Sequence, residues 1–262
     1  MTFNMIPKHF RTYFFIYAIA LGLVGVGLFM HFAPQPDVEK TSYQKKVTVP
    51  QSHHTYPGAL KSGEQAVMFT LKKHDGEHFS LKQKLQQGPV VLTFFRGNWC
   101  PLCAAHLKEL EAIKPQVEEL DGQLVAISAQ TLAKTKQTQG KFSISYPVVS
   151  DKQMKITKAY GVDWPIPEED RDDFKAWLDK STGQSLNEFQ NTSGQNISGQ
   201  NTSGQDKSGQ NTSAWTLPVP ATYVIAPSGE IIYAHVDEDY KKRAQPEKIL
   251  NALRALTTSN NL

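Results

Sequence analysis

The chain has 262 residues, enough for one large domain or two small ones. Hydrophobic residues make up 39% of it and charged residues 20%, the composition of a globular protein with a buried core. The net charge is only +3 and the basic residues are scattered. The chain therefore lacks the clustered Lys/Arg surface that nucleic-acid binding requires.

The segment Thr12–Phe32 is apolar and carries no Lys, Arg, Asp or Glu. A helix of that length spans about 30 Å, the thickness of a bilayer core. Lys8 and Arg11 precede it, and positive charge stays on the cytoplasmic side. We predict an uncleaved anchor within residues 1–33, a cytoplasmic N-terminus, and an extracytoplasmic remainder facing a bacterial periplasm. A cleaved signal peptide fits less well, because the run is long and its exit lacks a small-x-small site. A buried core helix is the other alternative.

The segment 34–65 mixes Pro, Lys, Gln and Ser without periodicity, which indicates a linker or stalk. The folded domain is expected over 66–258, followed by a short tail, 259–262. Short apolar runs typical of strands recur along the domain: Val67–Leu71, Val90–Phe95, Leu124–Ser128, Pro147–Val149, Thr222–Ala226 and Ile231–Val236.

Helical patterns alternate with these runs. Leucine-rich stripes at three- to four-residue spacing cover Leu107–Val117 and, after Pro246, Ile249–Leu256. Pro227–Gly229 separates the last two apolar runs and predicts a β-hairpin. The alternation predicts an α/β fold with a parallel element in its sheet.

Residues 190–214 interrupt this order with five tandem pentapeptides of the type QNTSG. Apart from the final alanine, Ile197 is the only apolar residue in the five repeats. The segment is therefore expected to be a flexible insertion without a core. It contains four Asn-x-Ser sequons, which are usable only in a host with glycosylation machinery and are equally explained by repeat slippage: Asn191, Asn196, Asn201 and Asn211.

The chain has two cysteines, Cys100 and Cys103, in the order strand, Gly-Asn-Trp turn, Cys-Pro-Leu-Cys, helix. This order places them at a helix N-terminus, where unpaired amides and the helix dipole stabilise a thiolate. With two residues between them, one sulfur can attack a partner and the other can resolve the product. The pattern predicts redox chemistry, with metal binding or a structural pair as alternatives.

The stretch FFRGNWCPLC, together with LVAISAQT, YPVVSD and LPVPATYVIAPSGEI downstream, resembles the alkyl hydroperoxide reductase/thiol-specific antioxidant (peroxiredoxin-like) branch of the thioredoxin-like superfamily. The resemblance covers residues 66–256 apart from the repeats. It implies a thioredoxin-like fold, a central mixed sheet flanked by helices. It also implies an antioxidant oxidoreductase that reduces peroxides or protein disulfides, is returned to the thiol form by an extracytoplasmic thiol reductant, and needs no cofactor or metal.

The site departs from the peroxiredoxin motif Pro-x-x-x-Thr-x-x-Cys. In that alignment Cys103 takes the attacking position, Cys100 replaces the Thr and Arg96 replaces the Pro. The arginine expected two residues before Thr222 is replaced by Pro220. This proline resembles the cis-proline of thioredoxins, so we predict a cis Val219–Pro220 bond that faces the cysteines and frees the Val219 amide for a partner chain. Cys100 is the attacking residue in that thioredoxin alternative.

Other residues near the motif have two explanations each. Trp99 can shape a docking surface for the partner or simply pack, and Arg96 can lower a thiolate pKa or pair on the surface. With Pro220 and Thr222 they form the predicted substrate- or partner-binding set. His106 is expected to be a solvated helix residue rather than a base or ligand.

The alternative from another class is a copper metallochaperone that uses Cys100, Cys103 and His235. Soft thiolates select Cu(I), but such motifs have three residues between the cysteines, and this chain has two. We therefore predict a membrane-tethered thiol–disulfide redox protein.

Overall fold

The computed structural model describes residues 51–182 and 216–259. The predicted anchor, most of the linker and the pentapeptide repeats lie outside these ranges. Within them, no helix combines the length and the apolar character needed to cross a membrane.

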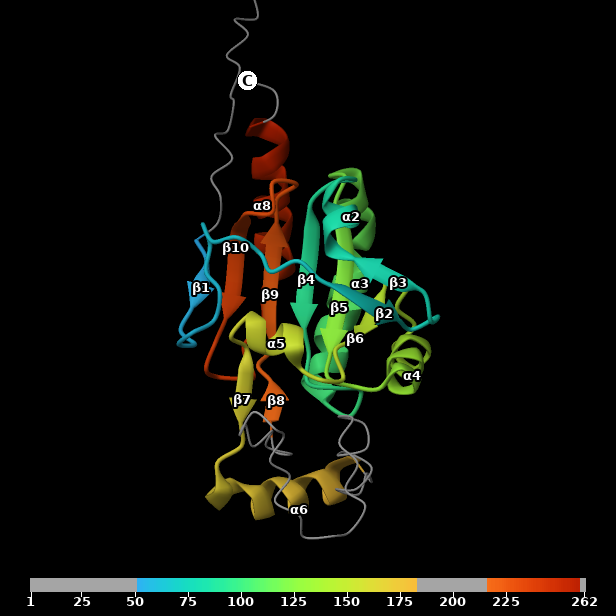
Figure 1. Cartoon of the computed structure of the whole chain (residues 1–262), viewed down its shortest axis with the longest axis vertical. Helices are drawn as coiled ribbons and strands as arrows, with labels where there is room; N and C mark the ends of the chain where they lie inside the picture. Colours follow the sequence, from blue (N-terminus) through green and yellow to red (C-terminus); the bar gives the residue numbers. More distant parts are fainter. Residues whose placement is uncertain (1–50, 183–215, 260–262) are drawn as a thin grey trace, which may run out of the picture. The chain divides into compact units, whose positions relative to one another are not determined.

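The described residues form one large mixed sheet with the strand order β1-β10-β9-β4-β5-β6-β2-β3 (Figure 1). Its central strand β4 runs parallel to β5 and antiparallel to β9. The strands of this sheet are β1 His53–His54, β2 Thr70–Lys73, β3 His78–Ser80, β4 Val90–Phe94, β5 Gln123–Ser128, β6 Val148–Ser150, β9 Ala221–Ile225 and β10 Ile231–Val236.

A separate antiparallel pair, β7 Asp163–Pro165 with β8 Thr216–Pro218, lies beyond the end of the sheet at which β4 leads into α3 (Figure 1). The helices are α2 Leu81–Leu85, α3 Pro101–Glu119, α4 Leu132–Phe142, α5 Lys155–Ala159, α6 Arg171–Thr182 and α8 Pro246–Ser259, with a 3-10 turn at Glu168–Asp170.

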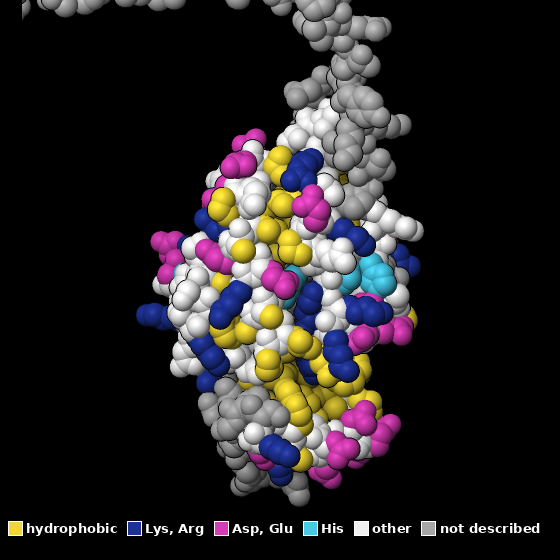
Figure 2. Space-filling model, turned by 180° about the vertical axis from the view of Figure 1, so that it is seen from behind, with side chains coloured by type: hydrophobic (Ala, Val, Ile, Leu, Met, Phe, Trp, Pro, Cys, Tyr) yellow, Lys and Arg dark blue, Asp and Glu magenta, His cyan; other side chains and the backbone are white. Residues whose placement is uncertain are grey.

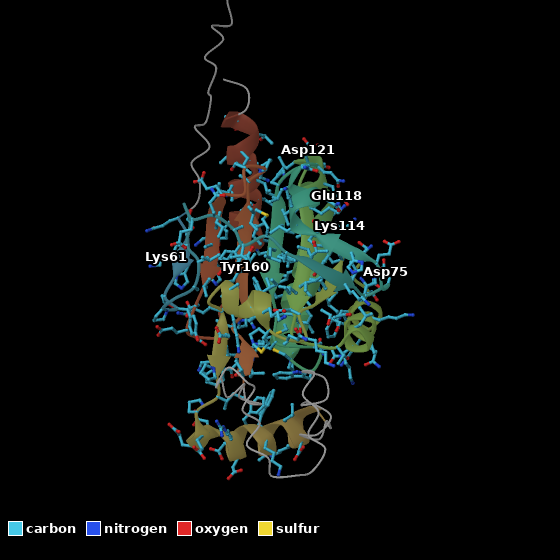
Figure 3. All side chains as sticks on the ribbon, in the orientation of Figure 1. Lys61, Asp75, Lys114, Glu118, Asp121 and Tyr160 are labelled. Atoms are coloured by element: carbon cyan, nitrogen blue, oxygen red, sulfur yellow. The ribbon has the colours of Figure 1, made fainter. Side chains whose placement is uncertain are left out.

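Both faces of the central strands are buried, which explains their continuous apolar sequences. All five residues of β4 are buried. The leucine stripe of α3 and the apolar face of α8 pack on one face. On the other face, α2 and the segment before β2 cover the sheet, and Tyr160 after α5 packs its ring against Phe94 and Tyr223 (Figure 3). The predicted α/β class with a parallel element is therefore confirmed.

The folded part begins earlier than the predicted start at Ala66. β1 pairs with β10 in parallel, with His53 opposite His235. Ala59 is buried to 3% exposure in the core, although the sequence around it resembles a linker. The predicted hairpin at Pro227–Gly229 is present, since β9 and β10 pair antiparallel.

Candidate active site

The two cysteines lie where β4 passes through a tight turn into α3. Cys100 is the N-cap of α3, and Pro101 begins the helix, where proline costs no hydrogen bond. In the turn, a Cβ on Gly97 would lie 2.4 Å from the indole nitrogen of Trp99, so only glycine fits. The sequence thus places Cys103 in the first turn of the helix, as predicted.

The sulfur atoms of Cys100 and Cys103 are 2.7 Å apart, and the Cys103 backbone N–H points to the Cys100 sulfur at 3.4 Å. Both side chains are buried, at 3% and 1% exposure. The pair is in the dithiol form. One sulfur can therefore reach the other without movement of the helix.

The electrostatic surroundings separate the two thiols. Burial raises the pKa of Cys103, but four interactions outweigh it and lower that pKa to about 6: the hydrogen bond from Cys100, the charge of Arg243, the Arg96 backbone N–H and the charge of Arg96. The hydrogen bond with Cys103 and then burial raise the pKa of Cys100. Cys103 is therefore the thiolate at neutral pH, and Cys100 holds the proton and donates it.

Arg243 is the residue that sequence reasoning missed. It lies in the loop between β10 and α8, and its guanidinium donates to the Cys103 sulfur at 3.9 Å. The same guanidinium donates to the carbonyls of Tyr240 and Lys242, which fixes its direction. The sequence offers only a run of basic residues here, KKR, with no sign of which one reaches the sulfur.

Arg96 lies two residues after the end of β4 at Phe94 and is half-buried beside the pair. Its guanidinium lies over the ring of Tyr240 at 4.6 Å and near that of Trp99 at 5.4 Å. Its backbone and its charge both act on Cys103. Of the two predicted alternatives, the structure places Arg96 next to the thiolate.

Trp99 packs rather than presenting its ring to solvent. It is 5% exposed, and its ring meets Phe174 at 6.1 Å and Trp177 at 5.6 Å, both on α6. Trp177 itself is 39% exposed. Seen from behind, hydrophobic side chains gather at the end of the molecule that holds α6, with basic side chains beside them (Figure 2). The aromatic side chains that pack on Trp99, next to the cysteines, therefore come from α6.

Thr222 and His106 form a buried polar contact, not an exposed one. The Thr222 hydroxyl lies 3.3 Å from His106 Nε2 and 3.1 Å from the Thr93 hydroxyl. The expectation that His106 is solvated is wrong, because the side chain is 4% exposed between α3 and the sheet. Burial, and then the charges of Arg243 and His235, lower the pKa of His106 to about 3, so it is neutral.

The Val219–Pro220 bond is trans, since the described residues contain no cis peptide bond. The cis prediction is therefore wrong. The chain before Pro220 is held by the β7–β8 pair, and the Val219 N–H donates to the Val162 carbonyl at 2.7 Å. That amide is not available to a partner chain, which also contradicts the predicted use of Val219.

His235 does not complete a copper site with the cysteines. Its ring stacks on that of His53, with 5.0 Å between the ring centres, at the edge of the sheet. Among the described residues no three His, Cys, Asp or Glu side chains are grouped to bind a metal ion. The copper alternative has no support in this arrangement.

A pocket of about 350 Å³ includes in its wall Arg96, the residue whose backbone and charge act on Cys103. Arg96 and Pro220 line it together with aromatic side chains from β7 and from the loop after β10. Arg96 therefore acts on the Cys103 sulfur and also lines the pocket.

The mixed sheet, with a dithiol at the N-terminus of the helix that follows its central strand, defines a thioredoxin-like redox protein of the peroxiredoxin type. A profile of the AhpC/TSA family matches residues 62–234. The chain belongs to the AhpC/TSA family.

Curated relatives match over part of their length. The chain is 31% identical over 108 residues to thiol-disulfide oxidoreductase ResA of Halalkalibacterium halodurans, covering 41% of this chain and 60% of the relative. It is 27% identical over 105 residues to chloroplastic peroxiredoxin Q of Oryza sativa subsp. japonica, covering 40% and 48%. The chain thus spans about half to three-fifths of the length of these relatives.

Solved structures support the fold. Peroxidoxin BcpB from Mycobacterium tuberculosis superposes with a TM-score of 0.53 at 20% identity, covering 75% of this chain and 98% of that one. A mutant of Xylella fastidiosa PrxQ gives a TM-score of 0.53 at 15% identity, covering 76% and 99%. These similarities concern the fold alone.

Proposed function

We propose that this protein is a thiol peroxidase in which Cys103 attacks the peroxide and Cys100 resolves the product. The observation that carries the proposal is the surroundings of Cys103, where the hydrogen bond from Cys100 and the two arginines Arg243 and Arg96 together lower the pKa of its thiol to about 6. Two cations next to one buried sulfur favour the thiolate, the reactive species, at neutral pH. The cations also stabilise the alkoxide or hydroxide that leaves when the O–O bond breaks.

The reaction balances with the groups at the site. The Cys103 thiolate attacks the outer oxygen of ROOH, the O–O bond breaks, and RO⁻ takes a proton from water to leave as ROH. Cys103 is then a sulfenic acid. The Cys100 sulfur, which lies 2.7 Å from Cys103 in the reduced pair, displaces water to form the Cys100–Cys103 disulfide. Two electrons and two protons from an external dithiol restore the two thiols.

A peroxide fits the site better than a protein disulfide. An extended partner chain needs a free backbone edge beside the sulfurs, and the Val219 amide is already bonded to Val162. The attacking sulfur is 1% exposed, which admits a small oxidant more easily than a protein disulfide. The name of the ResA relative keeps disulfide reduction as the alternative that an experiment has to separate.

To distinguish peroxide reduction from disulfide reduction, the reduced full chain is mixed with one equivalent of hydrogen peroxide and its intact mass is followed. We expect a loss of about 2 Da within seconds, the formation of one disulfide. The matched sample contains oxidised glutathione as a disulfide oxidant. Fast oxidation by glutathione disulfide with no reaction towards peroxide would replace the peroxidase by a thiol–disulfide oxidoreductase.

The proposed location is the outer face of a bacterial inner membrane, with residues 12–32 as a single-pass anchor. The support is the apolar run and the basic residues Lys8 and Arg11 before it. A reporter fused after Lys45, ahead of the folded residues, should be active only outside the cytoplasm. Activity of a cytoplasmic reporter at this position would reverse the orientation.

A further inference from the structure

The pocket that Arg96 lines is built from segments that are distant in the chain. Tyr56 comes from the segment after β1, Trp164 from β7, Pro220 from the start of β9 and Tyr240 from the loop after β10. These side chains give the pocket apolar and largely aromatic walls. Its volume of about 350 Å³ lies at the lower end of the range of small-molecule sites.

One lining residue of this pocket acts directly on the reactive sulfur, and a second is linked to that sulfur through Arg243. The backbone of Arg96 binds the Cys103 sulfur while its guanidinium lines the pocket. Tyr240 lines the pocket, and its carbonyl accepts from the guanidinium of Arg243, which also reaches Cys103. A molecule in the pocket is therefore adjacent to the residues that activate the thiolate.

The charges leave one cation without a counterpart. Arg96 and Arg243 face one thiolate, at Cys103, and the sum is one positive charge. Among the described residues, neither arginine has a carboxylate within 4.0 Å. Glu238, on the pocket rim, is exposed to solvent and does not pair with Arg96.

From this geometry we infer that the pocket binds a monocarboxylate with an apolar body, held by the Arg96 guanidinium. This inference rests on the proposed peroxidase function and names its substrate class: organic hydroperoxides that carry a carboxylate. A planar guanidinium matches the two oxygens of a carboxylate, and partial burial strengthens that bond. The walls around Trp164 and Tyr56 take the apolar part of the ligand.

Glu238 provides a second test of the inference, because the loss of its charge should have the opposite effect on binding to the loss of the Arg96 charge. Its carboxylate shares the pocket with the ligand's carboxylate, and two like charges repel. Removal of the Glu238 charge should tighten binding of the acid, whereas removal of the Arg96 charge should weaken it. If the net charge of the protein alone controlled binding of the acid, removing the charge of any other surface residue of the same sign would have the same effect.

The experiment measures binding of two unreactive probes, 4-phenylbutyrate and its neutral amide, to the reduced full chain in non-ionic detergent by calorimetry. We expect the acid to bind wild type about tenfold more tightly than the amide, the usual contribution of a charge-assisted hydrogen bond. Arg96→Gln should remove this preference, and Glu238→Gln should increase it. The matched control is Lys114→Gln, which removes a cation paired with Glu118 at 2.7 Å on α3, away from the pocket (Figure 3).

Equal binding of acid and amide by wild type would overturn the inference, and this comparison needs no variant. A preference that survives Arg96→Gln in a chain with wild-type near-ultraviolet circular dichroism would also overturn it. So would weaker acid binding by Glu238→Gln. A chain that binds the acid but does not react with peroxides would refute the proposed function alone. An active peroxidase without acid preference would refute the pocket assignment alone.

Discussion

The guanidinium of Arg243 lies 3.9 Å from the Cys103 sulfur, although the two residues are 140 positions apart in the chain. The contact joins the loop after the last strand to the first turn of α3. It acts together with the hydrogen bond from Cys100 and with Arg96, so that three separate residues stabilise the same thiolate. The reactivity of Cys103 therefore depends on the tertiary fold as well as on the Cys-x-x-Cys motif.

Replacing Arg243 by Gln should raise the pKa of Cys103, because a nearby cation favours the ionised thiol. We expect the midpoint of the pH–rate profile for reaction with hydrogen peroxide to move up by about one pH unit or more. Arg243→Lys keeps the charge and should restore most of the profile. Stopped-flow measurement of peroxide reduction between pH 5 and 9 provides the test.

Arg254→Gln is the control for this variant, because Arg254 on α8 pairs with Glu247 at 2.8 Å and does not act on the pKa of either cysteine. Its profile should match wild type. A profile of Arg243→Gln with an unchanged midpoint would show that Arg243 does not set the thiolate pKa.

Replacing each cysteine by serine should change the reaction with peroxide in a different way. Cys100→Ser keeps the Cys103 thiolate and a hydroxyl donor beside it, so one equivalent of peroxide should add one oxygen, about 16 Da, and stop at the sulfenic acid. Cys103→Ser leaves only the buried Cys100 thiol and should react slowly. Intact mass spectrometry after a few seconds of reaction distinguishes the two. Rapid oxidation of Cys103→Ser with an inert Cys100→Ser would assign the attack to Cys100.

The fold was predictable where burial dictates the sequence. The central strands have continuous apolar sequences because both faces are covered, and the predicted run Val90–Phe95 corresponds to β4, Val90–Phe94. The helix α4 has no apolar stripe and was missed. Its buried positions include Thr135 and Thr138, whose hydroxyls donate to carbonyls within the helix. Such a helix cannot be recognised from hydrophobic periodicity.

The site was predictable only in its local part. Strand, turn and helix follow one another in sequence, so the positions of Cys100 and Cys103 at the helix N-terminus followed from pattern alone. The contact of Arg243 required the loop after β10 to fold back onto α3, which no local pattern encodes. His106 was expected in solvent for the same reason, since the strand that buries it lies more than 100 residues later, at Thr222.

Thr222→Val tests whether Thr222 supports the structure or binds the substrate. The change removes the hydroxyl that contacts His106 Nε2 and Thr93 and leaves a buried nitrogen without a partner. We expect a loss of about 1–3 kcal/mol in the free energy of unfolding, measured with urea, and an unchanged pH–rate midpoint. Thr70→Val, at an exposed position of β2, should change stability by less than about 0.5 kcal/mol. A normal stability combined with a raised KM for peroxide would return Thr222 to the substrate site.

His106 should make the folded state sensitive to acid. Burial lowers its pKa to about 3 in the native protein, whereas the unfolded chain takes up the proton near the ordinary value of 6.5. Between these values the unfolded state binds the extra proton, so stability is fully present above pH 6.5 and is lost as the pH falls towards 3. The groups that face the ring act in both directions: Arg243 and His235 oppose its protonation, and the Glu109 carboxylate lies 3.6 Å from Nδ1.

His106→Gln cannot take up a proton in this range and should therefore flatten the decline. Between pH 6 and 4 we expect the slope of the unfolding free energy against pH to fall by up to about 1.4 kcal/mol per pH unit. Part of the decline should remain in the variant, because burial also lowers the pKa of His235 to about 4. Urea unfolding of the reduced chain at several pH values measures the slope, with the exposed His78→Gln as the control. If wild type and His106→Gln lose stability in parallel on acidification, His106 does not hold a depressed pKa in the native state.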